Sequence, residues 1–109
     1  MAGYFYILAS RRNGTLYAGC TTDLPKRIYE HREGLIPGFT TKYGVKRLVY
    51  FETYDDVSDA IVRERRVKEW NRDWKIQLIE KENPFWDDLA VSLLGFEPLP
   101  FPGAQPAPQ

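Results

Sequence analysis

The sequence of 109 residues is poor in the residues that build covalent or metal-held frameworks, with one cysteine and one histidine. A single cysteine, Cys20, excludes an internal disulfide and a cysteine-based zinc cluster. No apolar run approaches the roughly 20 residues of a membrane-spanning helix, so we expect no membrane partner. The first residues lack a basic segment followed by a long apolar one, so we expect no secretory signal and a reducing, cytoplasmic location.

An excess of charge of one sign is also missing, because 15 Lys and Arg balance 15 Asp and Glu. The balance is uneven along the chain, since every Lys and Arg lies at or before Lys81 and four acidic residues follow it. Residues 1–81 therefore carry 15 basic and 11 acidic side chains. This basic part is able to neutralise phosphates locally, although ordinary solvated charge gives the same distribution.

Strand and helix signals are present in an order that predicts a single α+β domain. Residues 4–9, 15–19 and 47–54 are rich in aromatic and β-branched side chains, which is typical of strands. Asn13-Gly14 suits a tight turn between the first two of them. The order predicts a small three-stranded antiparallel sheet flanked by helices, ββαβαα with a short extra C-terminal helix.

Capping residues and stop signals mark the ends of the helices. They predict a first helix from Asp23 to Gly34, a second from about residue 56 to Trp70, a third over 73–83 and a short fourth over 84–94. Residues 35–46 have the glycine and proline content of a loop. We expect a domain over residues 1–94 and an extended or disordered proline-rich tail over 95–109.

Three polar residues occupy helix positions where apolar side chains are expected. Glu64 lies at the centre of the inward face of the second helix, and Arg27 and His31 lie one turn apart on that of the first. A buried, unpartnered carboxylate is costly, so Glu64 either pairs with Lys68, one turn later, or binds a hard divalent cation. Arg27 at the rim and His31 as a satisfied core histidine are the structural alternatives. Together the three favour a polar site.

Two strand tyrosines extend the candidate site. Tyr6 belongs to the first predicted strand and Tyr17 to the second, where Ala18 and Gly19 leave space beside the sheet. Tyrosine is a common strand residue, so each one alone indicates only packing.

These residues stand in a sequence that resembles the GIY-YIG nucleases. YFY at residues 4–6 and YAG at 17–19 are similar to the two parts of the family signature. GCTTDLPKRIYEH at 19–31 is similar to the family segment that carries its arginine and histidine, and AIVRERRVKEW at 60–70 to its metal-binding helix. The resemblance covers about residues 4–80 and is greatest to small stand-alone bacterial proteins that consist of little more than this domain.

The resemblance implies a role for each matching residue. Tyr6 and Tyr17 match the signature tyrosines, and Gly19 matches the glycine that closes the second element as a structural residue at the site. Arg27 and His31 match the catalytic arginine and the histidine one turn later, and Glu64 matches the glutamate that binds the single metal ion. Asn71 and Asn83 are alternative counterparts of an asparagine that many members carry after the metal helix.

The implied function is a metal-dependent endonuclease that hydrolyses phosphodiester bonds in nucleic acid. DNA is the expected substrate, with RNA as an open alternative, and DNA repair is the expected biological setting. Mg²⁺ is the expected cofactor, and Mn²⁺ is expected to substitute. Tyr6 or Tyr17 would accept a proton from the attacking water while Arg27 neutralises the phosphate. The main alternative is a catalytically weak or inactive nucleic-acid-binding module, and a weaker one is an interaction domain with an internal ion-pair network.

Other cationic and aromatic residues have less specific interpretations. Lys26, Lys42, Lys46 and Arg47 are candidate phosphate contacts, with ordinary solvated charge as the alternative for each. Trp70 and Trp74, four residues apart, are expected to pack helices in the core. The oligomeric state is open at this level.

Overall fold

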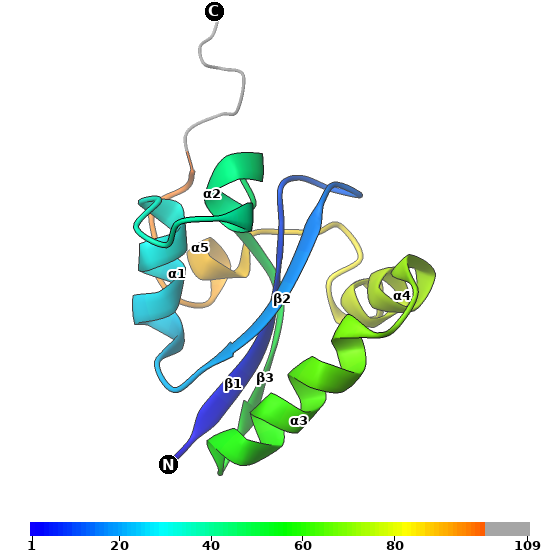
Figure 1. The fold of residues 1–109 in the computed structure, drawn as a ribbon. Helices are drawn as coiled ribbons and strands as arrows, with labels where there is room; N and C mark the ends of the chain where they lie inside the picture. The colour runs from blue at the N-terminus through cyan, green and yellow to red at the C-terminus, as the bar shows by residue number, and fades with distance from the viewer. Residues whose placement is uncertain (100–109) are drawn as a thin grey trace, which may run out of the picture.

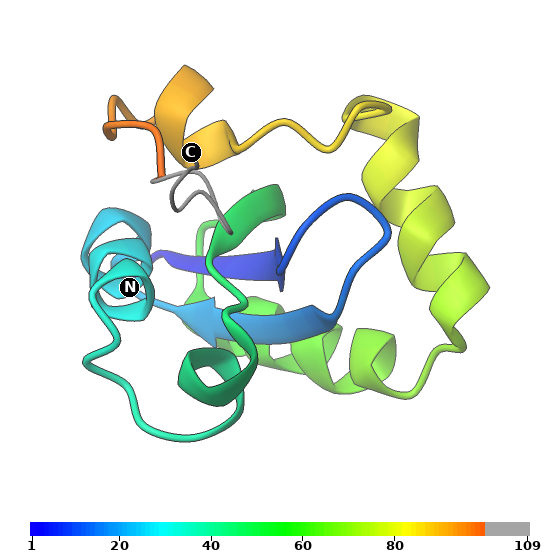
Figure 2. The same ribbon diagram turned by 90° about the horizontal axis from the view of Figure 1, so that it is seen from above.

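The computed structural model describes residues 1–99, in which helices cover both faces of a three-stranded antiparallel sheet (Figure 1 and Figure 2). The strand order is β2-β1-β3, so β1 is central and β2 is an edge strand. The elements are β1 (Gly3–Ala9), β2 (Leu16–Thr21), α1 (Leu24–Arg32), α2 (Phe39–Tyr43), β3 (Arg47–Tyr54), α3 (Val57–Lys68), α4 (Arg72–Glu82) and α5 (Leu89–Ser92). The predicted α+β class and three-stranded sheet are confirmed.

The hairpin between β1 and β2 sets the register on which the candidate site depends. Asn13 has a φ of 58°, a left-handed conformation that asparagine tolerates and that a tight reversal requires. In the antiparallel register that follows, Tyr6 lies opposite Gly19 and Leu8 lies opposite Tyr17. Opposite residues project to the same side of a sheet, so Tyr17 shares a face with Leu8. Tyr6 lies two residues before Leu8 on the same strand and therefore points to that face as well.

Alternation along β1 divides the core into two parts. Phe5 and Ile7 point to the face covered by α3 and α4. Tyr6 and Leu8 point to the opposite face, where Leu24 of α1 packs against them. Figure 1 shows α1, α2 and α5 on one side of the sheet and α3 and α4 on the other. Tyr6 therefore faces the helix that carries the predicted arginine and histidine.

The helices that carry the candidate site begin at their predicted caps. The Asp23 carboxylate accepts a hydrogen bond from the backbone N–H of Lys26 at 3.1 Å, and Pro25 lies in the first turn of α1. The Asp56 carboxylate accepts from the backbone N–H of Ser58 at 3.3 Å at the start of α3. Each cap satisfies a backbone donor that the first helical turn leaves free.

Two segments differ from the prediction. Residues 35–46 are not a plain loop, because they contain α2, bounded by Gly38 with a φ of 112° and Gly44 with a φ of 62°. Glycines that suggested a loop are here the helix ends. The short last helix is only α5, because residues 84–88 are not helical. Within them, Trp86 has a φ of 60°, which is incompatible with a helix, and its side chain is buried, 1% exposed.

The tryptophan prediction holds for one ring only. Trp70 is half-buried and packs against the core on the α3 and α4 face. Trp74 is 54% exposed, so its prediction as a core residue is wrong. It lies in the first turn of α4 and makes an edge-on contact with Trp70, with 5.9 Å between ring centroids.

Among residues 1–99, no helix has the length and apolar character needed to cross a membrane. The predicted tail over 95–109 stays a prediction, since residues 100–109 lie outside the described part of the chain.

Candidate active site

Hydrogen bonds join β1, α1 and α2 at the centre of the candidate site. Tyr6 Oη lies 3.1 Å from His31 Nε2, and His31 Nδ1 lies 3.1 Å from Thr40 Oγ1. His31 and Thr40 are 2% and 4% exposed. Both ring nitrogens of the histidine are therefore paired, which holds the ring in one orientation. Thr40 was not predicted, because only the fold of α2 brings this threonine from a loop-like segment to the histidine.

Burial keeps His31 neutral. Its pKa falls to about 4, first because burial disfavours the charged ring and second because the Arg27 cation is near, while Glu30 opposes the shift. A neutral imidazole donates at one nitrogen and accepts at the other, and a threonine hydroxyl does both. Thr40 therefore supports either tautomer, and His31 is able to accept from a Tyr6 phenol or donate to a Tyr6 phenolate.

The same burial predicts an acid-sensitive fold. An unfolded histidine binds a proton near pH 6.5, whereas the folded one resists protonation until about pH 4, so stability is lost as pH falls through this window. Between pH 7 and pH 4, we expect the wild type to lose on the order of 3 kcal/mol more unfolding free energy than His31→Gln. Urea unfolding at the two pH values measures the difference. His31 is the chain's one histidine, so equal losses in both proteins would contradict this expectation.

The Tyr6 phenol is fully enclosed. Its pKa is raised above the ordinary tyrosine value, first by burial and then by Tyr17, while the neighbouring Arg27 guanidinium lowers it. The phenol is therefore protonated at neutral pH and needs added positive charge to act as a base. Arg27 is held at 3.3 Å from Glu30 by a partly exposed ion pair on α1. Such a pair is weak, so little free energy is needed to separate Arg27 from Glu30.

Gly19 and Tyr17 of β2 form the wall beside the phenol. A Cβ atom built on Gly19 would lie 2.6 Å from Tyr6 Oη, so only glycine admits the phenol in this position. The Tyr17 ring centroid lies 6.4 Å from that of Tyr6 and 5.6 Å from that of His31. The strands and α1 thus bring both signature tyrosines and the histidine together.

Glu64 of α3 is linked to the tyrosine wall through Lys68. Its Oε2 pairs with Lys68 Nζ at 2.7 Å, and its Oε1 accepts from the Cys20 thiol at 3.2 Å. Burial and the bond to Glu64 raise the pKa of the thiol to about 11, so Cys20 stays protonated and donates. Lys68 Nζ also lies 5.6 Å from the centre of the Tyr17 ring. Glu64 therefore forms the ion pair with Lys68 that the sequence offered as the alternative to a metal ligand.

The donor set at Glu64 suits one kind of metal site. Residues 1–99 contain no group of three or more His, Cys, Asp or Glu side chains placed to hold a metal ion. Zinc or calcium cages are therefore a poor match, whereas Mg²⁺ takes one or two carboxylates, keeps several waters and completes its shell with substrate phosphates. Glu64 fits Mg²⁺ on the condition that Lys68 moves aside.

The two candidate asparagines both have structural partners. Asn71 caps α4, and its side-chain oxygen accepts from the backbone N–H of Trp74 at 2.9 Å. Asn83 is buried and donates to the backbone carbonyl of Val49 at 2.9 Å. Neither contact involves the tyrosines, His31 or Glu64.

The four predicted phosphate contacts lie at different places. Lys26 and Lys42 are exposed, on α1 and α2, and Lys46 is half-buried just before β3. Arg47 donates from Nη1 to the carbonyl of Trp86 at 3.3 Å, which ties it to the C-terminal segment. Two lysines that were not predicted as phosphate contacts, Lys68 and Lys75, line a pocket together with Tyr17.

The sequence model of the GIY-YIG catalytic domain matches residues 2–77. The chain belongs to the GIY-YIG family. It is 38% identical over 80 residues to a UPF0213 protein of Clostridium perfringens, spanning 73% of this chain and 85% of the relative. It is 35% identical over 82 residues to one of Haloquadratum walsbyi, spanning 74% and 92%. The solution structure of a UPF0213 protein of Bacillus halodurans, 32% identical, aligns with a TM-score of 0.52 over 81% of this chain and 93% of that one.

Family membership confirms the resemblance seen in the sequence. GIY-YIG domains are in general nuclease-type domains that bind nucleic acid and depend on a metal ion, typically Mg²⁺.

Proposed function

We propose that this chain is a metal-dependent endonuclease that hydrolyses phosphodiester bonds in nucleic acid, with DNA as the expected substrate. The observation that supports the proposal most is the convergence of Tyr6, Tyr17, His31 and Glu64 from β1, β2, α1 and α3. Hydrogen bonds, ring contacts and the Lys68 contacts link all four. A core built only for packing has no reason to collect a histidine, two phenols and a carboxylate around the β1-β2 hairpin.

The chain's own residues supply the base and part of the charge relief. Arg27 turns from Glu30 to the scissile phosphate and binds it with its planar fork. The Arg27 charge stabilises the phenolate of Tyr6, whose proton has passed to solvent. The phenolate takes a proton from the attacking water, whose oxygen bonds to phosphorus as the bond from phosphorus to the leaving oxygen breaks. His31, by changing tautomer against Thr40, donates Nε2–H to that phenolate.

Glu64 would hold the cation. A bound Mg²⁺ would neutralise charge on the phosphate and on the leaving oxygen. Tyr17, half-buried beside Tyr6, orients the attacking water with its hydroxyl. Lys68 pairs with Glu64 and lies 5.6 Å from the centre of the Tyr17 ring, and it would turn from Glu64 toward the phosphate for Glu64 to hold the cation.

The proposal is tested by cleavage of nicked, branched and single-stranded DNA with Mg²⁺, with EDTA, and with Mg²⁺ restored. We expect cleavage that EDTA stops and Mg²⁺ recovers. Arg27→Ala is expected to lose at least about 100-fold in turnover with binding nearly kept, because the arginine acts on charge that develops in the transition state. Arg65→Ala, an exposed arginine of α3, is the matched control. An Arg27→Ala protein that cleaves at the wild-type rate would remove this residue from the mechanism.

A nucleic-acid-binding module is the second candidate function. It is favoured by the contacts of Glu64, since both carboxylate oxygens already have partners in Lys68 and Cys20. Binding to all the test substrates without cleavage in Mg²⁺ or Mn²⁺ would favour this alternative over the nuclease.

A further inference from the structure

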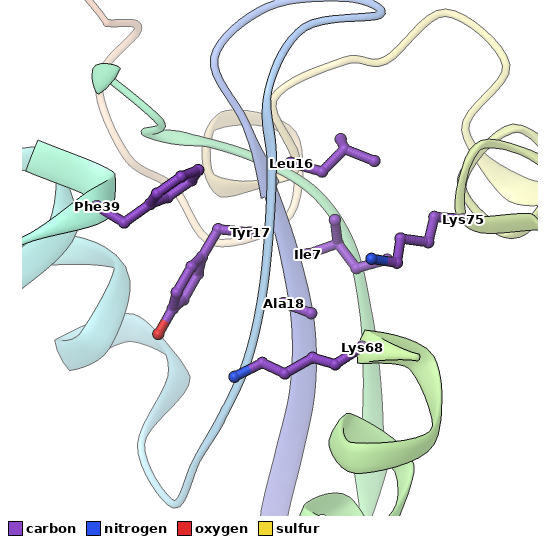
Figure 3. A pocket seen from close by; sticks show the side chains of 7 residues that line it. All are labelled: Ile7, Leu16, Tyr17, Ala18, Phe39, Lys68 and Lys75. Atoms are coloured by element: carbon purple, nitrogen blue, oxygen red, sulfur yellow. The ribbon is translucent and has the colours of Figure 1, made fainter. Parts of the chain in front are cut away.

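A pocket of about 240 Å³ lies along the edge strand β2, beside the candidate active site (Figure 3). Leu16 and Ala18 form its apolar floor, and the rings of Tyr17 and Phe39 stand on one side. Lys68 and Lys75 reach toward it from α3 and α4 on the other side. No carboxylate is among the residues that line it. The pocket therefore combines an apolar, aromatic surface with two lysines, of which Lys68 pairs with Glu64 outside the lining.

The pocket is continuous with the candidate site because two residues belong to both. Tyr17 contacts the His31 ring, and Lys68 pairs with Glu64. A group bound in the pocket would therefore lie next to a phosphate bound between Arg27 and Glu64. On a nucleic-acid strand, the neighbour of a phosphate is a nucleotide.

Of the two aromatic rings that line the pocket, Phe39 is the more exposed. It is 47% exposed, although its ring stacks on Tyr17 with 6.5 Å between centroids and 27° between planes. Tyr43, 51% exposed, continues the aromatic surface at 4.9 Å from Phe39, and Lys42 Nζ lies 5.4 Å from the Tyr43 ring. Exposed aromatic rings interleaved with lysines are the pattern on which bases stack while cations follow the backbone.

We propose that this pocket binds the base of an unpaired nucleotide next to the scissile phosphate, with Phe39 stacking on the base and Lys75 on its phosphate. The inference rests on the proposed function, since it names the substrate class of the same site. The pocket is smaller than the roughly 300–1,000 Å³ pockets that bury drug-sized ligands, so it suits one base and not a base pair. The preferred substrate is therefore DNA with a single-stranded segment at the cut, and not a continuous duplex.

The test measures binding in EDTA, so it does not depend on cleavage. Fluorescence anisotropy compares a single-stranded oligonucleotide with a blunt duplex for the wild type, Phe39→Ala and Phe39→Leu. We expect both variants to lose on the order of tenfold in affinity for the single strand and less than twofold for the duplex. Phe85→Ala, a 70% exposed phenylalanine outside the pocket, is the control and should match the wild type.

Lys75 gives a second, independent measurement. Lys75→Ala is expected to reduce the salt dependence of single-strand binding by about 0.7 in the slope of log affinity against log salt, the value of one lost phosphate contact. Lys81→Ala, an exposed lysine outside the pocket, should leave the slope unchanged.

The outcomes separate the inference from the proposed function. If the Phe39 variants bind single strand like the wild type, or lose single strand and duplex equally, or if the wild type binds neither, the inference is overturned even when cleavage is normal. If the wild type cleaves nothing but the Phe39 variants lose single-strand affinity selectively, the proposed nuclease function fails and the pocket assignment stands.

Discussion

Glu64→Gln is expected to lower the rate of DNA cleavage by a factor on the order of 10³, with nucleic-acid binding and folding nearly unchanged. The substitution keeps the shape of the side chain and removes the negative charge that would hold the cation. The cost to stability should be within about 1 kcal/mol, because the Lys68 side chain of the lost ion pair is 48% exposed. Cleavage rates at saturating Mg²⁺, and thermal unfolding of the same samples, measure the two effects.

Glu69→Gln is the matched control for this prediction. Glu69 is an exposed carboxylate five residues further along the chain, and its loss should leave cleavage unchanged. Glu64→Gln should also raise the Mg²⁺ concentration needed for any residual activity, which a purely structural role of Glu64 would not do. Full-rate cleavage by Glu64→Gln would exclude the metal role.

Tyr6→Phe is expected to reduce cleavage by about 10² to 10⁴, the range that general-base catalysis contributes. The variant also leaves His31 Nε2 without its buried partner, so a loss of about 1–3 kcal/mol in unfolding free energy should accompany it. Single-turnover cleavage rates and urea unfolding separate the chemical effect from the structural one. Tyr4→Phe, on the same face of β1 but outside the contacts of His31, is the control.

The pH dependence decides which phenol is the base. Because burial raises the pKa of Tyr6 above its ordinary value, the phenolate fraction rises about tenfold per pH unit across the neutral and mildly alkaline range. The wild-type rate should rise with pH in the same way. Tyr6→Phe should lose this rise and Tyr17→Phe should keep it at a lower rate. A pH profile flattened by Tyr17→Phe and kept by Tyr6→Phe would reverse the assignment.

Local signals predicted the parts of the site that local physics controls. Asp23 caps the start of α1, and Pro25 follows in its first turn. Arg27 and His31 are one turn apart, which places them on the same side of that helix. Helix starts and side-chain periodicity depend on neighbours within one turn, so the sequence was sufficient for them.

Contacts between distant segments could not be predicted from local sequence patterns. Thr40 lies nine residues after His31 in a segment rich in glycine and proline, and no periodicity connects the two. The choice between an ion pair and a metal ligand at Glu64 likewise depends on which side chains reach it, and Cys20, 44 residues away, is one of them. Burial of Trp86 and exposure of Trp74 follow from packing and not from residue type.

By itself, the sequence determined the fold class, the strand and helix order of the sheet and α1, and the set of residues that mark the family. Those depend on hydrophobic periodicity, turn chemistry and capping, which act over a few residues. Only the tertiary structure decided that the Tyr6 phenol is enclosed and bonded to a neutral histidine, that Gly19 must lack a side chain, and that Phe39 and two lysines form a pocket beside the site. These features arise because sheet register and helix packing bring together groups that are far apart in the chain, and burial then sets their protonation.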